Sequence, residues 1–304
     1  MKTTPLGQSA LNTSRIIYGA MRLAGDGSEA TRSRAYQALD TAIESGINHF
    51  DHADIYGQGR CEEWFGDFLR AHPGLRDQLI ITSKCGIRMA DQPQVGDPQR
   101  YDFSRAHILR SVEGSLSRLG VERLDCLLLH RPDFLMDPDE VAATFEHLHA
   151  QGQVAFFGVS NFTPDQVELL QSSCSFPLMV NQVEFNLNRI DPLYDGTLSQ
   201  CMRRRITCQS WSPLAGACYA PWQMRMTEAQ ANDVRQETER QAQQYGVGPD
   251  QVVLAWLLAH PARIAPVIGT LTPERIRAAV GAVDLTYGRE DWYRLLAARV
   301  GPVA

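Results

Sequence analysis

The sequence lacks the segments that would direct a protein into or across a membrane. No apolar run reaches the about 18 residues that a membrane-spanning helix needs. Residues 1–14 contain no apolar core of the kind found in a signal peptide. We therefore expect a cytoplasmic protein that has no membrane partner.

Cysteine pairs and blocks of one charge are missing as well. Seven cysteines are scattered along the chain without a C-x-x-C motif, which is typical of reduced thiols rather than of a disulfide framework or a zinc site. The net charge is −6, and acidic and basic residues are interspersed, so we expect no nucleic-acid partner. No linker or change in composition divides the chain, and residues 1–304 are predicted to form a single domain.

Short apolar runs that resemble buried strands alternate with longer segments of helical periodicity. Eight such strand-then-helix units can be counted, and their strand candidates span residues 16–21, 49–53, 79–84, 126–130, 154–160, 179–185, 207–213 and 264–270. Alternation of this kind implies parallel strands with right-handed crossovers. Because eight strands are present and no G-x-G-x-x-G motif follows the first, an α/β fold of the (β/α)8 TIM-barrel type is favoured over a doubly wound sheet.

Three further elements are predicted outside this count. Residues 4–12 have the turn residues of a short N-terminal β-hairpin, and two extra helices are expected at about 228–245 and 290–299. Three barrel helices have sequence signals for a capped start, namely a cap residue followed by proline at Asp137-Pro138, Thr163-Pro164 and Thr272-Pro273.

Four ionisable groups that can donate or accept a proton lie at or just after the ends of three successive strand candidates. Asp51, Lys84 and His130 end or follow these runs, and Tyr56 lies in a glycine-flanked turn five residues after Asp51. A parallel barrel collects its active site at this end of the strands. A lysine within about 4–6 Å would lower the pKa of a tyrosine, and an aspartate would keep that lysine charged. This set suits proton delivery to a carbonyl oxygen, with His130 donating a hydrogen bond, while a hydride reaches the carbon.

The same residues allow two other interpretations. His49, Asp51, His52 and Asp54 could be metal ligands of a barrel hydrolase, but strand alternation turns His49 and Asp51 away from His52, so we expect no metal site. Alternatively, Asp51 and Lys84 could be only a buried ion pair and Tyr56 a loop tyrosine. The joint placement of all four groups at strand ends favours an active site.

Several motifs together resemble the aldo-keto reductase family. They are FDHADIYG, the strand-end lysine of TSKCG, LLLHRPD, GVSNF, NQVEF and WSPLAG, in this order, and the resemblance extends from about residue 16 to residue 282. It implies a (β/α)8 barrel that uses NAD(P)H without a Rossmann domain. It also implies that Tyr56 is the general acid, that Lys84 and Asp51 tune it, and that His130 orients the carbonyl group.

The resemblance also implies a cofactor site. Ser160, Asn161 and Gln182 match residues that bind the nicotinamide carboxamide, Trp211 matches the aromatic residue that stacks on the ring, and the remaining matches are Met21, Ser212, Leu214, Gly216, Gly269, Thr270 and Arg275. The last three match the segment that holds the adenosine 2′-phosphate, so NADPH is favoured over NADH. Two departures suggest weaker affinity, because Gly269 replaces a lysine common in the family and Ala278-Ala279 replace a glutamate-asparagine pair.

A small-molecule carbonyl substrate is implied, and its pocket is expected to include Met21, Arg22, Tyr56, His130, Tyr219 and Trp222. No heptad pattern is present, so the protein is expected to be a monomer. The alternative function is that of an NADP(H)-binding regulatory or sensor subunit, similar to the potassium-channel β-subunits that resemble the same family. The absence of a long N-terminal extension argues against a role in channel gating.

Overall fold

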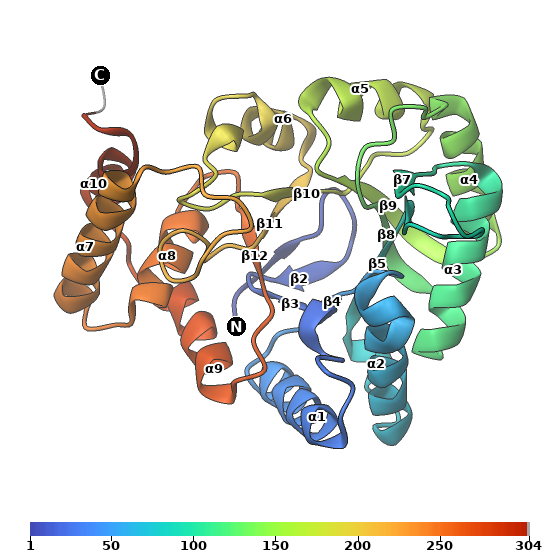
Figure 1. Ribbon diagram of the computed structural model, residues 1–304, viewed down its shortest axis with the longest axis horizontal. Helices are drawn as coiled ribbons and strands as arrows, with labels where there is room; N and C mark the ends of the chain where they lie inside the picture. The colour runs from blue at the N-terminus through green and yellow to red at the C-terminus, as the bar shows by residue number, and fades with distance from the viewer. Residues whose placement is uncertain (303–304) are drawn as a thin grey trace.

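The computed structural model describes residues 1–302, and its centre is a closed barrel of eight parallel strands surrounded by helices (Figure 1). The strands, in order around the barrel, are β3 (Ile17–Gly19), β4 (His49–Asp51), β5 (Ile80–Cys85), β8 (Leu124–Leu129), β9 (Val154–Ser160), β10 (Val180–Glu184), β11 (Thr207–Trp211) and β12 (Ala265–Ile268). β12 pairs with β3, Ile268 opposite Tyr18, and this pairing closes the barrel. The predicted (β/α)8 fold is therefore confirmed.

The helices that cover the barrel are α1 (Glu29–Glu44), α2 (Arg60–Ala71), α3 (Arg105–Leu119), α4 (Pro138–Ala150), α5 (Pro164–Ser173), α6 (Thr197–Arg204), α8 (Pro249–Leu258) and α9 (Pro273–Gly281). One large buried cluster of apolar side chains lies between these helices and the strands. No helix within residues 1–302 has both the length and the apolar character needed to cross a membrane. The single domain over residues 1–304 stays a prediction.

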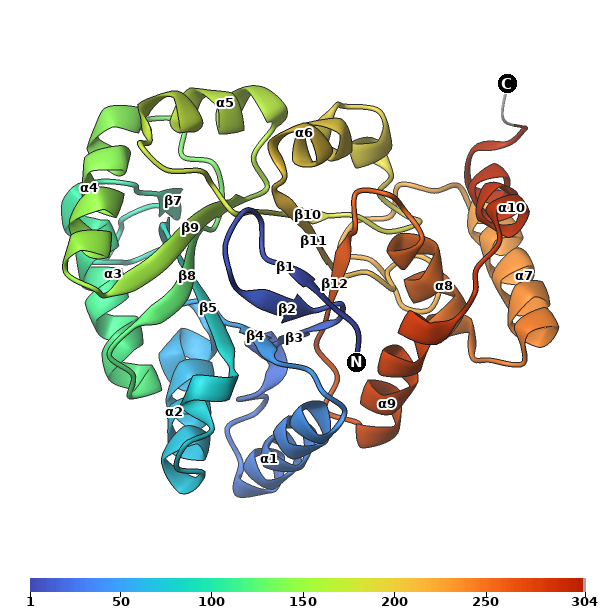
Figure 2. The ribbon, with the colours of Figure 1, turned by 180° about the vertical axis from the view of Figure 1, so that it is seen from behind.

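The predicted N-terminal hairpin forms from β1 (Thr3–Pro5) and β2 (Asn12–Ser14), slightly longer than expected. Figure 2 shows it lying across one end of the barrel. Leu6, at its turn, is fully buried in a cluster that includes Ile80 and Met179, which lie where β5 and β10 begin. The hairpin therefore covers the end of the barrel at which the strands start, and leaves the opposite end to the loops that follow them.

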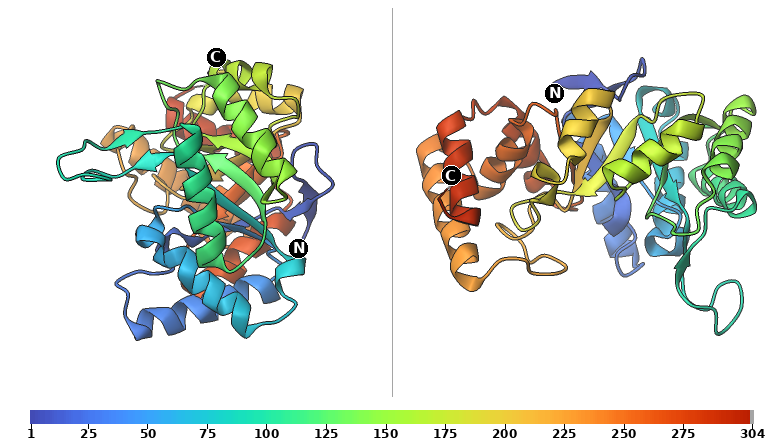
Figure 3. Two further views of the ribbon diagram at one scale, coloured as in Figure 1. Left: turned by 90° about the vertical axis from the view of Figure 1, so that its right-hand side faces the viewer. Right: turned by 90° about the horizontal axis from the view of Figure 1, so that it is seen from above.

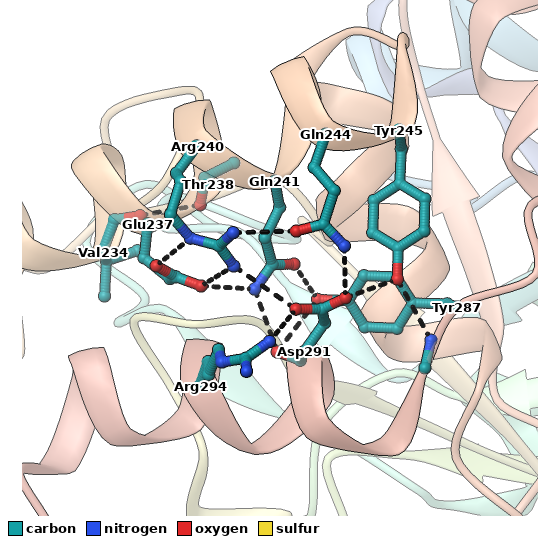
Figure 4. A network of polar contacts seen from close by, with 11 residues as sticks. Val234, Glu237, Thr238, Arg240, Gln241, Gln244, Tyr245, Tyr287, Asp291 and Arg294 are labelled. Carbon is teal, nitrogen blue, oxygen red and sulfur yellow. Dashed lines mark hydrogen bonds and ion pairs between the residues drawn. The ribbon is translucent and has the colours of Figure 1, made fainter.

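The two predicted extra helices are α7 (Glu228–Tyr245) and α10 (Arg289–Val300), which pack on one another at one side of the barrel (Figure 1). A polar network centred on the buried Asp291 joins them (Figure 4). Its carboxylate accepts hydrogen bonds from Tyr245 at 2.6 Å, Arg294 at 2.7 Å and Gln244 at 3.0 Å. Because so many donors meet one buried carboxylate, this contact is held by polar bonds as well as by packing.

One helix and one β-hairpin were not predicted. Helix α8 was missed because residues 252–257 are all buried, so its sequence is apolar on every face and has no amphipathic period. The segment expected to be a loop after β5 instead contains a two-stranded hairpin of β6 (Ile87–Arg88) and β7 (Arg100–Tyr101). Figure 3 shows this hairpin projecting from the end of the barrel opposite β1 and β2.

The helix starts were predicted well, with one error. Asp137 caps α4 by accepting from two backbone N–H groups, and Thr163 forms the predicted capping box with Gln166. Helix α9 begins at Pro273 as expected, but the Thr272 side chain makes no capping hydrogen bond, so the capped start predicted there is wrong. The first strand is also shorter than predicted, since residues 20–22 form a 3-10 turn.

Candidate active site

A sharp turn after β4 holds Tyr56 over the open end of the barrel. Asp51 is the last residue of β4, and Tyr56 starts a 3-10 turn, residues 56–59. The next three residues, Gly57, Gln58 and Gly59, all have left-handed backbone angles, with φ of 57°, 59° and 91°. Glycine adopts this conformation without a steric penalty, which explains why glycines flank the turn.

Lys84, on the neighbouring strand β5, bonds to both Asp51 and Tyr56. Its Nζ donates hydrogen bonds to Asp51 Oδ2 at 2.6 Å, to the His52 carbonyl oxygen at 2.8 Å and to the Tyr56 hydroxyl at 3.2 Å. The side chain is completely buried. The structure thus brings Asp51, Lys84 and Tyr56 together in the order in which the sequence analysis connected them.

Burial and charge act in opposite directions on Lys84. Burial lowers the pKa of its ammonium, but the Asp51 carboxylate and the Tyr56 hydroxyl favour the charged form, and the pKa ends above its usual value. Lys84 is therefore a buried cation with an acidic partner on one side and the tyrosine hydroxyl on the other.

The pKa of Tyr56 differs from the expectation. Burial raises it, and Lys84 acts in the predicted direction but is the smaller effect, so the pKa lies above 10 rather than below. The predicted lowering is wrong because the sequence showed a nearby cation but not that the phenol would be buried. At neutral pH the Tyr56 hydroxyl is protonated and able to donate.

His130 completes the group from the end of β8. Its ring meets the Tyr56 ring edge to face, with centroids 5.7 Å apart and planes at 82°. Burial first, and then the charges of Lys84 and Arg131, hold the pKa of His130 well below its usual value. A neutral imidazole at this position can donate a hydrogen bond without adding charge.

The residues expected at the nicotinamide lie at the ends of β9 and β11 and, for Gln182, on β10 between them. Ser160 donates to the Gln182 carbonyl oxygen at 2.8 Å, and the Asn161 amide donates to the His130 carbonyl oxygen at 3.1 Å. The Trp211 indole donates to Asn161 Oδ1 at 2.9 Å. Gln182 reaches Asp51 Oδ1 at 2.9 Å. One hydrogen-bonded chain therefore connects these residues with Asp51.

The residues expected at the phosphates follow β11 and β12. Ser212 and Gly216 have positive φ, and a Cβ at Gly216 would lie 2.6 Å from Asn188 Cβ, so only glycine fits that position. Arg275, in the first turn of α9, lies over the Tyr219 ring at 5.7 Å. Both residues line a cavity of about 380 Å³ beside α7. Leu214 packs at the edge of the core, and Gly269 and Thr270 directly follow β12.

The expected substrate residues are less concentrated. Met21 and Arg22 line a second cavity, of about 500 Å³, together with Gly57 beside Tyr56. A Cβ placed on Gly269 would lie 3.2 Å from an Arg22 nitrogen, so Arg22 reaches across to the loop after β12. Trp222, in the loop between β11 and α7, is 77% exposed.

Comparison with known proteins now identifies the family, because the model of the "Aldo/keto reductase family" matches residues 15–299. The chain belongs to the aldo/keto reductase family. It is 40% identical to the oxidoreductase YdhF of Escherichia coli (strain K12), covering 95% of this chain and 94% of that protein. It is 38% identical to a 6-dehydroglucose reductase of Agrobacterium fabrum, covering 96% of each chain.

A solved structure agrees with this assignment. The thermostable aldo-keto reductase Tm1743, crystallised with the inhibitor epalrestat, superposes with a TM-score of 0.82 at 26% identity, covering 98% of this chain and all of that one. This aldo/keto reductase thus shares both the family sequence pattern and the barrel of its solved relatives.

The two histidines of the alternative metal interpretation are both fully buried in this aldo/keto reductase. His49 bonds to the hydroxyls of Thr13 and Thr82, each at 2.8 Å. His52 packs on Phe65 with ring centroids 4.5 Å apart. Burial lowers the pKa of both imidazoles to about 3. Within residues 1–302, no three acidic, histidine or cysteine residues gather in a way that could hold a metal ion.

A group of buried polar residues that was not predicted lies behind the Tyr56 turn. Glu62 is fully buried and bonds to Ser83 at 2.6 Å and to Arg118 at 2.8 Å. Asp54 is nearby, and its pKa is raised to about 7, by burial first and the Glu62 charge second. A glutamate in the first turn of a helix ordinarily faces solvent, so only its place on the same helix face as Phe65 and Leu69 could have indicated burial.

Proposed function

We propose that the protein reduces aldehydes or ketones to alcohols by hydride transfer from NADPH, with Tyr56 as the general acid. The observation that carries the proposal is the position of the Lys84 ammonium, 2.6 Å from Asp51 and 3.2 Å from the Tyr56 hydroxyl, beside a neutral His130. A buried cation next to a protonated phenol stabilises the phenolate that forms when the proton leaves.

Each of the four residues has a distinct part in this reaction. Tyr56, protonated at neutral pH, donates its proton to the carbonyl oxygen as negative charge develops there. Lys84 stabilises the resulting phenolate, and Asp51 keeps Lys84 charged. His130 donates a hydrogen bond to the same oxygen and so orients the carbonyl group.

NADPH, when bound, supplies the hydride. The residues present fit this cofactor, because the glycine cradle at Gly216 admits no side chain and the Arg275 guanidinium lies at the rim of a cavity next to Tyr219. Ser160, Asn161 and Gln182 would hold the nicotinamide carboxamide, Trp211 its ring, and the residues toward the phosphates would be Met21, Ser212, Leu214, Gly216, Gly269, Thr270 and Arg275. A helix N-terminus and an arginine together favour the extra phosphate of NADPH.

The substrate in this proposal is a small polar aldehyde, with sugar aldehydes as the first class to test. The relative named 6-dehydroglucose reductase, at 38% identity over almost the full length of both chains, supports this choice. Met21, Arg22, Tyr219 and Trp222 would line the substrate pocket with Tyr56 and His130. Arg22 supplies a cation and hydrogen-bond donors suited to a hydroxylated or anionic substrate.

The test is the loss of absorbance at 340 nm when the protein is mixed with NADPH and a panel of aldose-derived dialdehydes, small aldehydes, α-dicarbonyls and ketones. Turnover with at least one carbonyl class, undiminished by EDTA, is the expected result. NADPH binding without turnover of any carbonyl would contradict the proposal and favour the regulatory or sensor subunit.

We also propose that the protein is a monomer in the cytoplasm. Five cysteines are buried as unpaired thiols, which supports a reducing compartment. Light scattering during gel filtration should give the mass of one chain, and a stable dimer would contradict this part of the proposal.

A further inference from the structure

A fully buried carboxylate outside the four-residue cluster is bonded to the strand that carries Lys84. Glu62 lies in the first turn of α2, directly after the Tyr56 turn. One of its oxygens accepts a hydrogen bond from the Ser83 hydroxyl at 2.6 Å, and Ser83 immediately precedes Lys84 on β5. The other oxygen accepts from Arg118 Nε at 2.8 Å and pairs with Nη2 at 2.7 Å.

Arg118, the partner of Glu62, also contacts the Tyr56 turn. It lies near the end of α3, and its side chain passes directly against Gly59, where a Cβ would approach Arg118 Cδ to 2.8 Å and Nε to 3.0 Å. The turn includes Gln58, which has the left-handed conformation that non-glycine residues adopt only when the surrounding structure holds it. On either side of Gln58, Gly57 lies against Ala24 and the first residues of α2, and Gly59 lies against Arg118.

We infer that Glu62 is a positioning residue, which fixes the distance between Lys84 on β5 and Tyr56 on the turn through Ser83 and Arg118. The inference rests on the proposed reductase function. The bond from Lys84 to the Tyr56 hydroxyl is the longest of the three that Lys84 donates, at 3.2 Å, so a small shift of the turn would break it. A displacement of about 1 Å between reacting groups costs about 100-fold in rate.

A matched control separates positioning from simple stabilisation. Asp125 and Arg76 form an ion pair at 3.0 Å with almost the same exposure as Glu62 and Arg118. Asp125 also accepts a hydrogen bond from the backbone N–H of Ile81, so it too is anchored to β5. It is bonded near the start of that strand, whereas Lys84 lies near its end. Loss of this pair should affect stability alone.

The experiment compares Glu62→Gln with Asp125→Asn for the free energy of unfolding, the Kd for NADPH, and kcat and KM for an aldehyde across pH. We expect Glu62→Gln to lose about 10-fold to 100-fold in kcat while KM and the Kd for NADPH stay within about threefold. Its kcat should also begin to fall at a higher pH than in the parent, because a displaced Lys84 favours the phenolate less. Asp125→Asn should keep kcat within about twofold at a similar loss of stability.

Rescue by charge provides a second readout. Arg118→Met should lose kcat as Glu62→Gln does, and Arg118→Lys, which can still pair with Glu62, should regain much of it. If Glu62→Gln does not fold, Ser83→Ala leaves the ion pair intact and should still lower kcat by about fivefold or more. An unchanged kcat and pH profile in the folded variant, or a loss no larger than that of Asp125→Asn, would overturn the inference.

Failure of the proposed function would be recognised separately. If none of the carbonyl compounds tested caused the parent protein to oxidise NADPH, the proposed function would be refuted. The rate of amide hydrogen exchange in residues 54–60 would then decide the inference about Glu62. Faster exchange there in Glu62→Gln than in Asp125→Asn supports the positioning role, whereas equal exchange overturns it.

Discussion

Lys84 Nζ lies 2.6 Å from Asp51 Oδ2 in a place where at most 3% of either side chain is exposed. Such a pair is strongly interdependent, because removal of one partner leaves the other charge buried without compensation. The ammonium then loses its proton more easily, since burial alone would lower the pKa of Lys84.

Asp51→Asn should therefore lower both stability and activity. We expect a loss of about 3 kcal/mol in the free energy of unfolding, and at least a tenfold loss in kcat because an uncharged Lys84 no longer stabilises the phenolate. Urea denaturation and steady-state kinetics measure the two effects. A kcat within twofold of the parent would show that Lys84 does not need its partner.

Asp54 should make stability depend on pH. Its pKa is raised from 3.8 to about 7, so between these values the unfolded chain has lost the proton that the folded protein still holds. The contribution of this group to stability is therefore greatest below pH 4 and declines as pH rises to about 7. Asp54→Asn removes this decline. The free energy of unfolding of the variant, relative to that of the parent, should therefore increase between pH 5 and pH 8 by a few kcal/mol at most.

Urea denaturation at several pH values tests this expectation, and Asp77→Asn is the matched control because Asp77 is exposed. The difference between Asp77→Asn and the parent should stay constant over the same range. If Asp54→Asn behaved in the same way, the carboxyl of Asp54 would not be the titrating group.

Arg275 should determine the preference for NADPH. Arg275 lies in the first turn of α9 with its guanidinium over the Tyr219 ring, where a phosphate would gain a charge-assisted hydrogen bond worth about 1.5–3 kcal/mol. Arg275→Met should raise the Kd for NADPH about 10-fold to 100-fold and leave that for NADH within about threefold. Fluorescence titration gives both constants. Arg277→Met, exposed on the same helix, should change neither, and equal losses for both cofactors would contradict the assignment.

Asp291 should be a stabilising residue without an effect on turnover. Asp291→Ala removes the hydrogen-bond acceptor that links α7 and α10 in Figure 4, and leaves the donors of Tyr245 and Arg294 without their partner. This loss should lower the free energy of unfolding by about 3 kcal/mol. Asp284→Ala breaks an ion pair with Lys2, and the Asp284 side chain is 79% exposed. This variant should lose less than about 1 kcal/mol in the free energy of unfolding. Equal losses for the two variants would show that the network adds little.

The barrel and the four-residue cluster could be predicted because their signals are local. Each strand is a short apolar run, and Asp51, Lys84 and His130 stand at the ends of such runs, which a parallel barrel brings to one edge. Periodicity failed for α8, whose apolar faces carry no pattern, and turn chemistry did not reveal the β6–β7 hairpin.

Burial was the property that the sequence did not reveal. It accounts for the high pKa of Tyr56, the neutral His130 and the missed Glu62, since each depends on how completely neighbouring elements exclude water.

The most direct test of the central claim is the turnover of Tyr56→Phe with NADPH and an activated aldehyde such as 4-nitrobenzaldehyde, together with its Kd for NADPH. The variant lacks only the hydroxyl that lies 3.2 Å from Lys84 Nζ. We expect kcat to fall by about 100-fold or more, with the Kd for NADPH within about twofold of the parent. Reduction of the aldehyde as fast as by the parent would contradict the role of Tyr56 as proton donor.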